Sequence, residues 1–169
     1  MGKLIPGQQG MRLSPDHPKG LGGWLVLVQI GLYLTLISTV LTIFQFFTTT
    51  FGSETWDKLT TPGEGDYHTL WRPTLLFEVI ANIVIVLLVA YLLILLYNKK
   101  SVFPRWLIFF YLGNLLVLIV DAVLLSNIPS SDEWVSGNRV QDIARTLLTC
   151  LIWITYVLRS KRVRNTFVE

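Results

Sequence analysis

The stretch NRVQDIARTLLTCLIWITYVLRSKRVR, residues 138–164, decides whether the chain crosses a membrane three times or four. Between Arg145 and Arg159 lie thirteen uncharged residues, which make roughly 20 Å of helix at about 1.5 Å per residue. The hydrocarbon core of a bilayer is roughly 30 Å thick. The helix therefore either fails to span, or it begins near Arg139 and carries Asp142 and Arg145 inside the membrane.

The rest of the chain favours a membrane protein. Of its 169 residues 52% are hydrophobic and only 15% are charged, which is unlike a soluble domain. Runs of sufficient length to span, including the fourth discussed above, cover residues 21–47, 74–98, 106–126 and 139–158. We therefore predict an all-α, four-helix transmembrane bundle over residues 21–159, preceded by a mobile arm (1–20) and followed by a basic tail (160–169).

The distribution of charge predicts the orientation. The arm, the turn before the third span and the tail carry ten Lys and Arg residues against two acids, whereas the opposite side carries three against six. Because positive residues remain in the cytoplasm, we expect both termini there. The basic tail is expected to touch anionic lipid headgroups through Arg159, Lys161, Arg162 and Arg164.

Ionisable residues on three of the predicted helices share one level. Glu78 lies four residues into its span, Asp121 five residues before the end of its span, and Arg145 six residues into the last. Each is thus within about 9 Å of the outer boundary. Polar residues at helical spacing fall on the same faces, and such faces should point into the bundle. The predicted intramembrane polar network comprises Glu78, Asn82, Asn114, Asp121, Asp142 and Arg145.

Two functions compete for this network. In the first, Arg145 pairs with either Glu78 or Asp121 and fixes the bundle of a non-enzymatic membrane interaction or accessory protein. In the second, three acids oppose this one arginine, and a carboxylate buried without a partner tends to hold a proton. That property suits a small proton-coupled transporter or ligand-binding membrane protein, which we expect to be a homodimer because one such bundle is narrow.

An enzyme that acts on lipid headgroups through the same acids is a third alternative. The sequence contains no metal-ligand spacing, no phosphate-binding glycine loop and no nucleophile beside a base. We therefore expect no enzyme, no catalytic residue, no metal site and no cofactor. The expected partners are the lipid bilayer and a second copy or another membrane protein, with no role for nucleic acid.

Several stretches resemble a known family. They are PKGLGGWLVLVQIGLY near the first span, LFEVIANIVI and NKKSVFPRWLIFFYLGN in the middle, LIVDAVL, and RTLLTCLIWITYVLRSKRVRNTFV at the end. Together they resemble the bacterial domain-of-unknown-function family 2569 from Pro18 to Val168. The resemblance implies a small four-span protein of the bacterial inner membrane, and it supports Glu78, Asp121 and Arg145 as residues to test. It implies no reaction.

Overall fold

The computed structural model describes residues 23–63, 66–129 and 138–167, and these residues are almost entirely helical. The predicted arm lies outside the described residues. In chain order the elements are α1 (Trp24–Gln45), the π-helical turn η1 (Phe46–Thr50), α2 (Glu54–Thr60), α3 (Trp71–Tyr97), α4 (Phe103–Ser126), α6 (Arg139–Arg159) and α7 (Lys161–Thr166).

Four of these helices are long and apolar enough to cross a membrane, which confirms the predicted all-α fold with four spans. The boundaries differ slightly from the prediction. α1 continues through η1 to Thr50, and α3 begins three residues early, so that Pro73 falls in its first turn, where a missing N–H breaks no helical bond. α6 begins at Arg139, as expected, because the Asn138 side chain accepts a hydrogen bond from the Gln141 backbone N–H at 3.2 Å.

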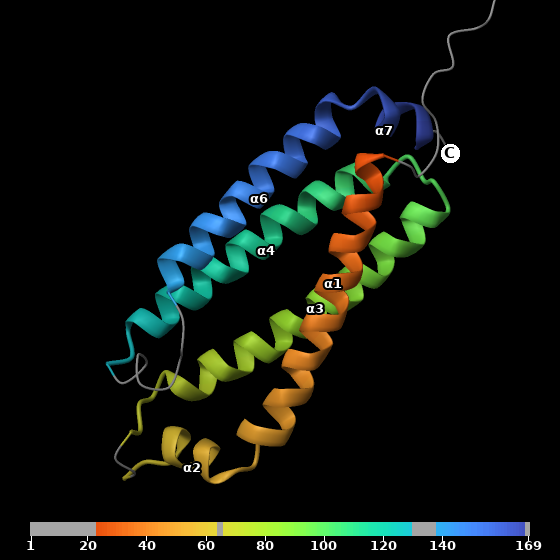
Figure 1. Cartoon of the computed structure of the whole chain (residues 1–169). Coiled ribbons are helices and arrows are strands. Elements are labelled where there is room, and N and C mark those ends of the chain that lie inside the picture. The colour runs from red at the N-terminus through yellow and green to blue at the C-terminus, as the bar shows by residue number, and fades with distance from the viewer. Residues whose placement is uncertain (1–22, 64–65, 130–137, 168–169) are drawn as a thin grey trace, which may run out of the picture.

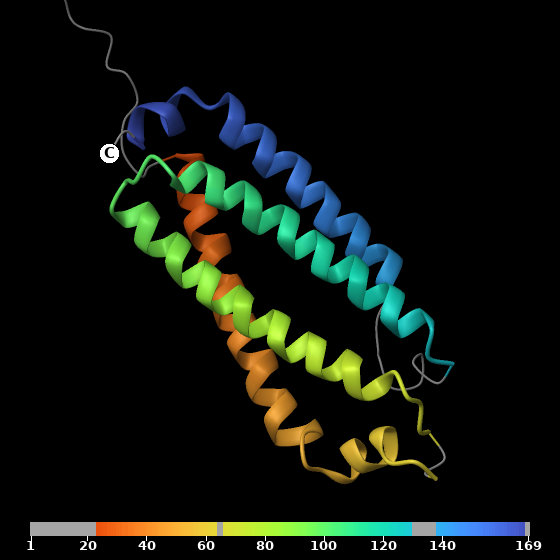
Figure 2. The ribbon, with the colours of Figure 1, turned by 180° about the vertical axis from the view of Figure 1, so that it is seen from behind.

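The long helices pack in the order α1, α3, α4 and α6, each mainly against the next. They converge at the end that carries α7 and the turn between α3 and α4, as Figure 1 and its reverse view in Figure 2 show. The core at this end joins all four long helices and α7. It includes Leu25, Val28, Leu92, Leu96, Phe103, Leu107, Val157 and Phe167.

At the opposite end α1 diverges from α6, and the short helix α2 lies beside the end of α1 and the start of α3 (Figure 1). A smaller core there joins Leu59 of α2 to Trp71 and Leu75 of α3 and Leu125 of α4. The sequence did not indicate α2, because seven residues within a polar segment carry little helical periodicity.

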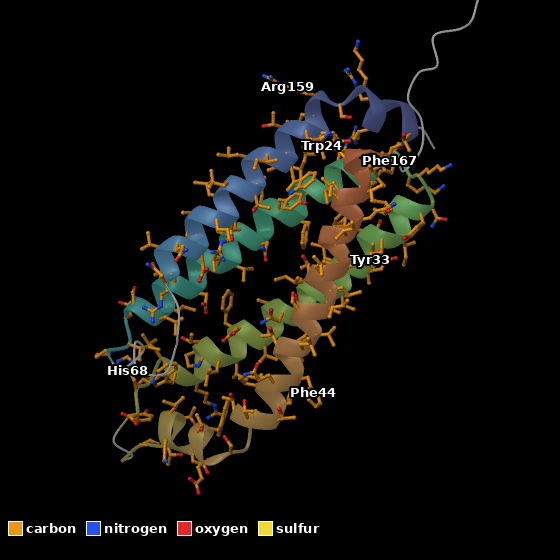
Figure 3. All side chains as sticks on the ribbon, viewed as in Figure 1. Trp24, Tyr33, Phe44, His68, Arg159 and Phe167 are labelled. Carbon is orange, nitrogen blue, oxygen red and sulfur yellow. The ribbon has the colours of Figure 1, made fainter. Side chains whose placement is uncertain are left out.

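The predicted basic tail contains the helix α7, which packs against the bundle. The Ser160 hydroxyl accepts a hydrogen bond from the Val163 backbone N–H at 3.3 Å and so caps α7. Phe167 is buried and stacks on Phe103, with ring centroids 4.6 Å apart. Trp24, Arg159 and Phe167 lie at this end of the molecule in Figure 3, far from His68.

Candidate functional site

All six residues of the predicted polar network line one cavity between α3, α4 and α6. The cavity has a volume of about 300 Å³, which is near the lower end of the range for small-ligand pockets. α3 contributes Glu78 and Asn82, one helical turn apart, and α4 contributes Asn114 and Asp121, two turns apart. α6 completes the lining with Asp142, Arg145 and Thr146.

Glu78 and Asp121 face this cavity from neighbouring helices, and their carboxylates are close enough to act on each other electrostatically. The charge of Arg139, at the start of α6, also acts on Asp121. The Oδ1 atom of Asp121 is buried, yet no hydrogen-bond donor within the described part of the chain reaches it. Buried acceptors are normally satisfied, so this atom marks a position where a donor is required.

Arg145 does not occupy the expected position. Among the described residues no ion pair joins Arg145 to Glu78 or to Asp121, so the structure does not support the predicted pairing across helices. Its guanidinium instead lies 4.0 Å from Asp142, one turn earlier on α6, and the two side chains are 71% and 53% exposed. Arg145 therefore lines the cavity from α6 with an exposed guanidinium.

A second compartment of about 280 Å³ adjoins the polar cavity. The two share the lining residues Phe77, Ala81, Ile85, Asn114 and Val117. From there the second compartment continues along α3 to Leu88 and along α4 to Phe110, with a lining surface that exposes no polar atoms. We call the first the polar compartment and the second the apolar compartment.

A separate cavity of about 290 Å³ lies between the end of α1, η1, α2 and α3. Glu78 belongs to its wall as well, so this side chain lies between two cavities. Trp71 also lines it, and the buried Trp71 Nε1–H has no acceptor within the described residues. Nothing in the sequence pattern shows that α2 covers Trp71.

Two further interactions escaped the sequence analysis. The Tyr33 and Tyr97 hydroxyls are 2.8 Å apart and join α1 to α3. The buried Cys150 thiol donates to the Tyr111 carbonyl at 3.3 Å and joins α6 to α4. Both pairs are far apart in sequence, and no local signal connects their members.

Of the basic tail residues, Arg159 ends α6, and Lys161 and Arg164 are exposed on α7. The Arg162 side chain lies outside the described part of the structure. These exposed charges lie at the same end as the basic turn that follows α3.

Comparisons with known proteins place the chain in a family. No curated protein and no solved structure matches it. Residues 18–168 match the family described as "Protein of unknown function (DUF2569)". Because this match covers nearly the whole chain, the protein belongs to the DUF2569 family, as the sequence motifs indicated.

Proposed function

We propose that this protein is a non-enzymatic, ligand-binding protein of the bacterial inner membrane. In this proposal the polar compartment receives a cationic group that donates hydrogen bonds to Glu78 and Asp121. The observation that carries the proposal is the buried Oδ1 atom of Asp121, an acceptor without a donor in the wall of an open cavity. Ionisable residues within membrane spans are rare, and they commonly mark ligand or ion pathways.

The charges around the compartment favour a cation. Three carboxylates line it against one guanidinium, and that guanidinium lies beside Asp142. Glu78 and Asp121 therefore have no positive partner among the other side chains of the lining. The positive charge of Arg139, which does not line the compartment, attracts the Asp121 carboxylate. This arrangement supports ligand binding over the alternative of a closed ion-pair network that holds the helices in register.

The proposed orientation places both termini in the cytoplasm. The start of α1, the turn after α3 and the helix α7 lie together at one end, which is where the exposed Lys and Arg residues concentrate. Glu78 is seven residues into α3, so the polar compartment would lie about 10 Å below the outer end of that helix.

Thiol chemistry tests the proposal. Cys150 is the single cysteine, so Cys150→Ala gives a background in which Asn114→Cys reports on the polar compartment. A cationic methanethiosulfonate reagent should modify this thiol about tenfold faster than an anionic reagent of similar size, because a cleft of one charge concentrates the opposite charge. Adding Asp121→Asn should reduce that preference.

Val89→Cys in the same background is the control for access, because Val89 is fully buried and should stay unmodified. Equal rates for the two reagents at Asn114→Cys, or a faster anionic reagent, would contradict a cation-binding compartment. A preference that survives Asp121→Asn would show that the charge of this aspartate is not its source.

A further inference from the structure

The position of the apolar compartment indicates what kind of molecule the polar compartment accepts. Along α3 both compartments begin at Phe77, but the carboxylate of Glu78 lies near that end, whereas the apolar lining extends to Leu88, one turn past the last polar-compartment residue, Ile85. The apolar compartment thus overlaps the polar one and ends about 15 Å from Glu78, just past the middle of the helix. A ligand that fills both compartments has its polar group near the helix end and its apolar part toward the bilayer centre.

The apolar compartment also opens toward the surroundings of the protein. Ile80 and Val84 line it and are 60% and 55% exposed. In a membrane, such exposed apolar side chains on a spanning helix face acyl chains. A hydrocarbon chain can therefore enter from the bilayer without crossing a polar surface.

The polar compartment offers complementary charges for a headgroup with two charges of opposite sign. Glu78 and Asp121 can accept hydrogen bonds from an ammonium group, and the free Oδ1 acceptor favours a group that carries N–H bonds. Arg145, which lines the same compartment with an exposed guanidinium, can bind a phosphate.

We infer that the ligand is a bilayer phospholipid with a primary ammonium headgroup, bound with its ammonium at Glu78 and Asp121, its phosphate at Arg145 and an acyl chain in the apolar compartment. This inference rests on the proposed function, and it adds the chemical class of the ligand. The charges of the lining assign the ammonium to the two acids and the phosphate to Arg145. The acyl chain would run along α3 away from α2, as it does in a lipid of the leaflet nearer α2.

Native mass spectrometry of the detergent-purified full chain tests the inference. The probes are short-chain phosphatidylethanolamine, phosphatidylcholine and phosphatidylglycerol with identical acyl chains, together with free phosphoethanolamine. Phosphatidylethanolamine should bind about tenfold or more tightly than the other two lipids, because they lack the hydrogen bonds of the ammonium to charged acceptors. Asp121→Asn should remove most of this difference.

Gly113 gives a variant that acts on the apolar compartment alone. It lines this compartment, and a Cβ atom added there meets nothing within 4 Å. Gly113→Leu should weaken binding of the lipid roughly tenfold by filling the compartment, Gly113→Ala should weaken it less, and neither should change binding of phosphoethanolamine. Gly31→Leu on α1 is the matched control, because a Cβ atom there also meets open space.

The outcomes separate the inference from the function on which it rests. Equal affinity for the three lipids, or unchanged lipid binding in Gly113→Leu, would overturn the phospholipid assignment. Phosphoethanolamine binding as tightly as the lipid would also overturn it, while the proposed cation site would stand. Failure of the proposed function itself would appear in the thiol experiment, which uses no lipid ligand.

Discussion

Substitution of Arg145 by glutamine distinguishes the structure described here from a bundle held by ion pairs. The Arg145 guanidinium has one ion-pair partner among the described residues, Asp142, at 4.0 Å, and both side chains are more than half exposed. Where water fills the cavity, exposed pairs of this kind contribute about 0–1 kcal/mol. We therefore expect Arg145→Gln to change the free energy of unfolding by less than about 1 kcal/mol.

A buried ion pair across helices would behave differently. Removing one member of such a pair leaves an uncompensated buried charge and costs about 3–5 kcal/mol. Reversible unfolding in mixed micelles of dodecyl maltoside and SDS, followed by tryptophan fluorescence, measures the difference. Asp142→Asn is the matched control, and it should have the same small effect as Arg145→Gln, because the two residues form one exposed pair.

One result would refute this reasoning. It is a loss of about 3 kcal/mol or more in Arg145→Gln that is recovered when Glu78→Gln or Asp121→Asn is added. Recovery by a second neutral substitution would show that Arg145 pairs across the cavity in the membrane, and it would identify the partner. The ion-pair network would then be the correct description, and the cation site would lose one of its two carboxylates.

Three further predictions follow from other contacts. Phe167→Ala should destabilise the protein by about 3 kcal/mol in the same unfolding assay, because it removes a buried ring stacked on Phe103, whereas Arg164→Ala on exposed α7 should have little effect; equal effects would contradict the docking of α7. Tyr33→Phe should destabilise the protein slightly, and a double-mutant cycle with Tyr97→Phe should show the two changes to be non-additive, because they share one hydrogen bond between helices; additive losses would exclude that bond. A reporter protein fused to the carboxyl terminus should be active only in the form that matures in the cytoplasm, and activity of a periplasmic reporter would reverse the proposed orientation.

Because α7 packs into the main core, the basic tail cannot be removed without disturbing the fold. A truncation after Arg159 would remove Val163 and Phe167, which belong to the main core, and would therefore disturb the fold together with any contact of the tail. Charge substitutions at the exposed residues Lys161 and Arg164 avoid this problem. Loss of binding to anionic vesicles in these variants, with unfolding unchanged, would support the predicted role of the tail.

The sequence predicted the spans correctly because each one is determined separately. A helix in lipid must satisfy its own backbone hydrogen bonds, so the length and hydropathy of one segment are enough to identify it. The same constraint explains why α6 includes Asp142 and Arg145, since without them the apolar run after Arg145 is too short to span. The level of Glu78, Asp121 and Arg145 followed from counting residues along each helix.

Only the tertiary structure decided how these residues meet. The sequence correctly grouped six polar residues on three helices, yet an ion pair requires the rotation and spacing of two helices, which depend on side-chain packing along their whole length. That packing places Arg145 in the wall of a cavity, beside Asp142, and leaves the Oδ1 atom of Asp121 without a donor among the described residues. The apolar compartment and the docking of α7 likewise arise from contacts between segments that are distant in sequence, for which hydropathy and periodicity carry no signal.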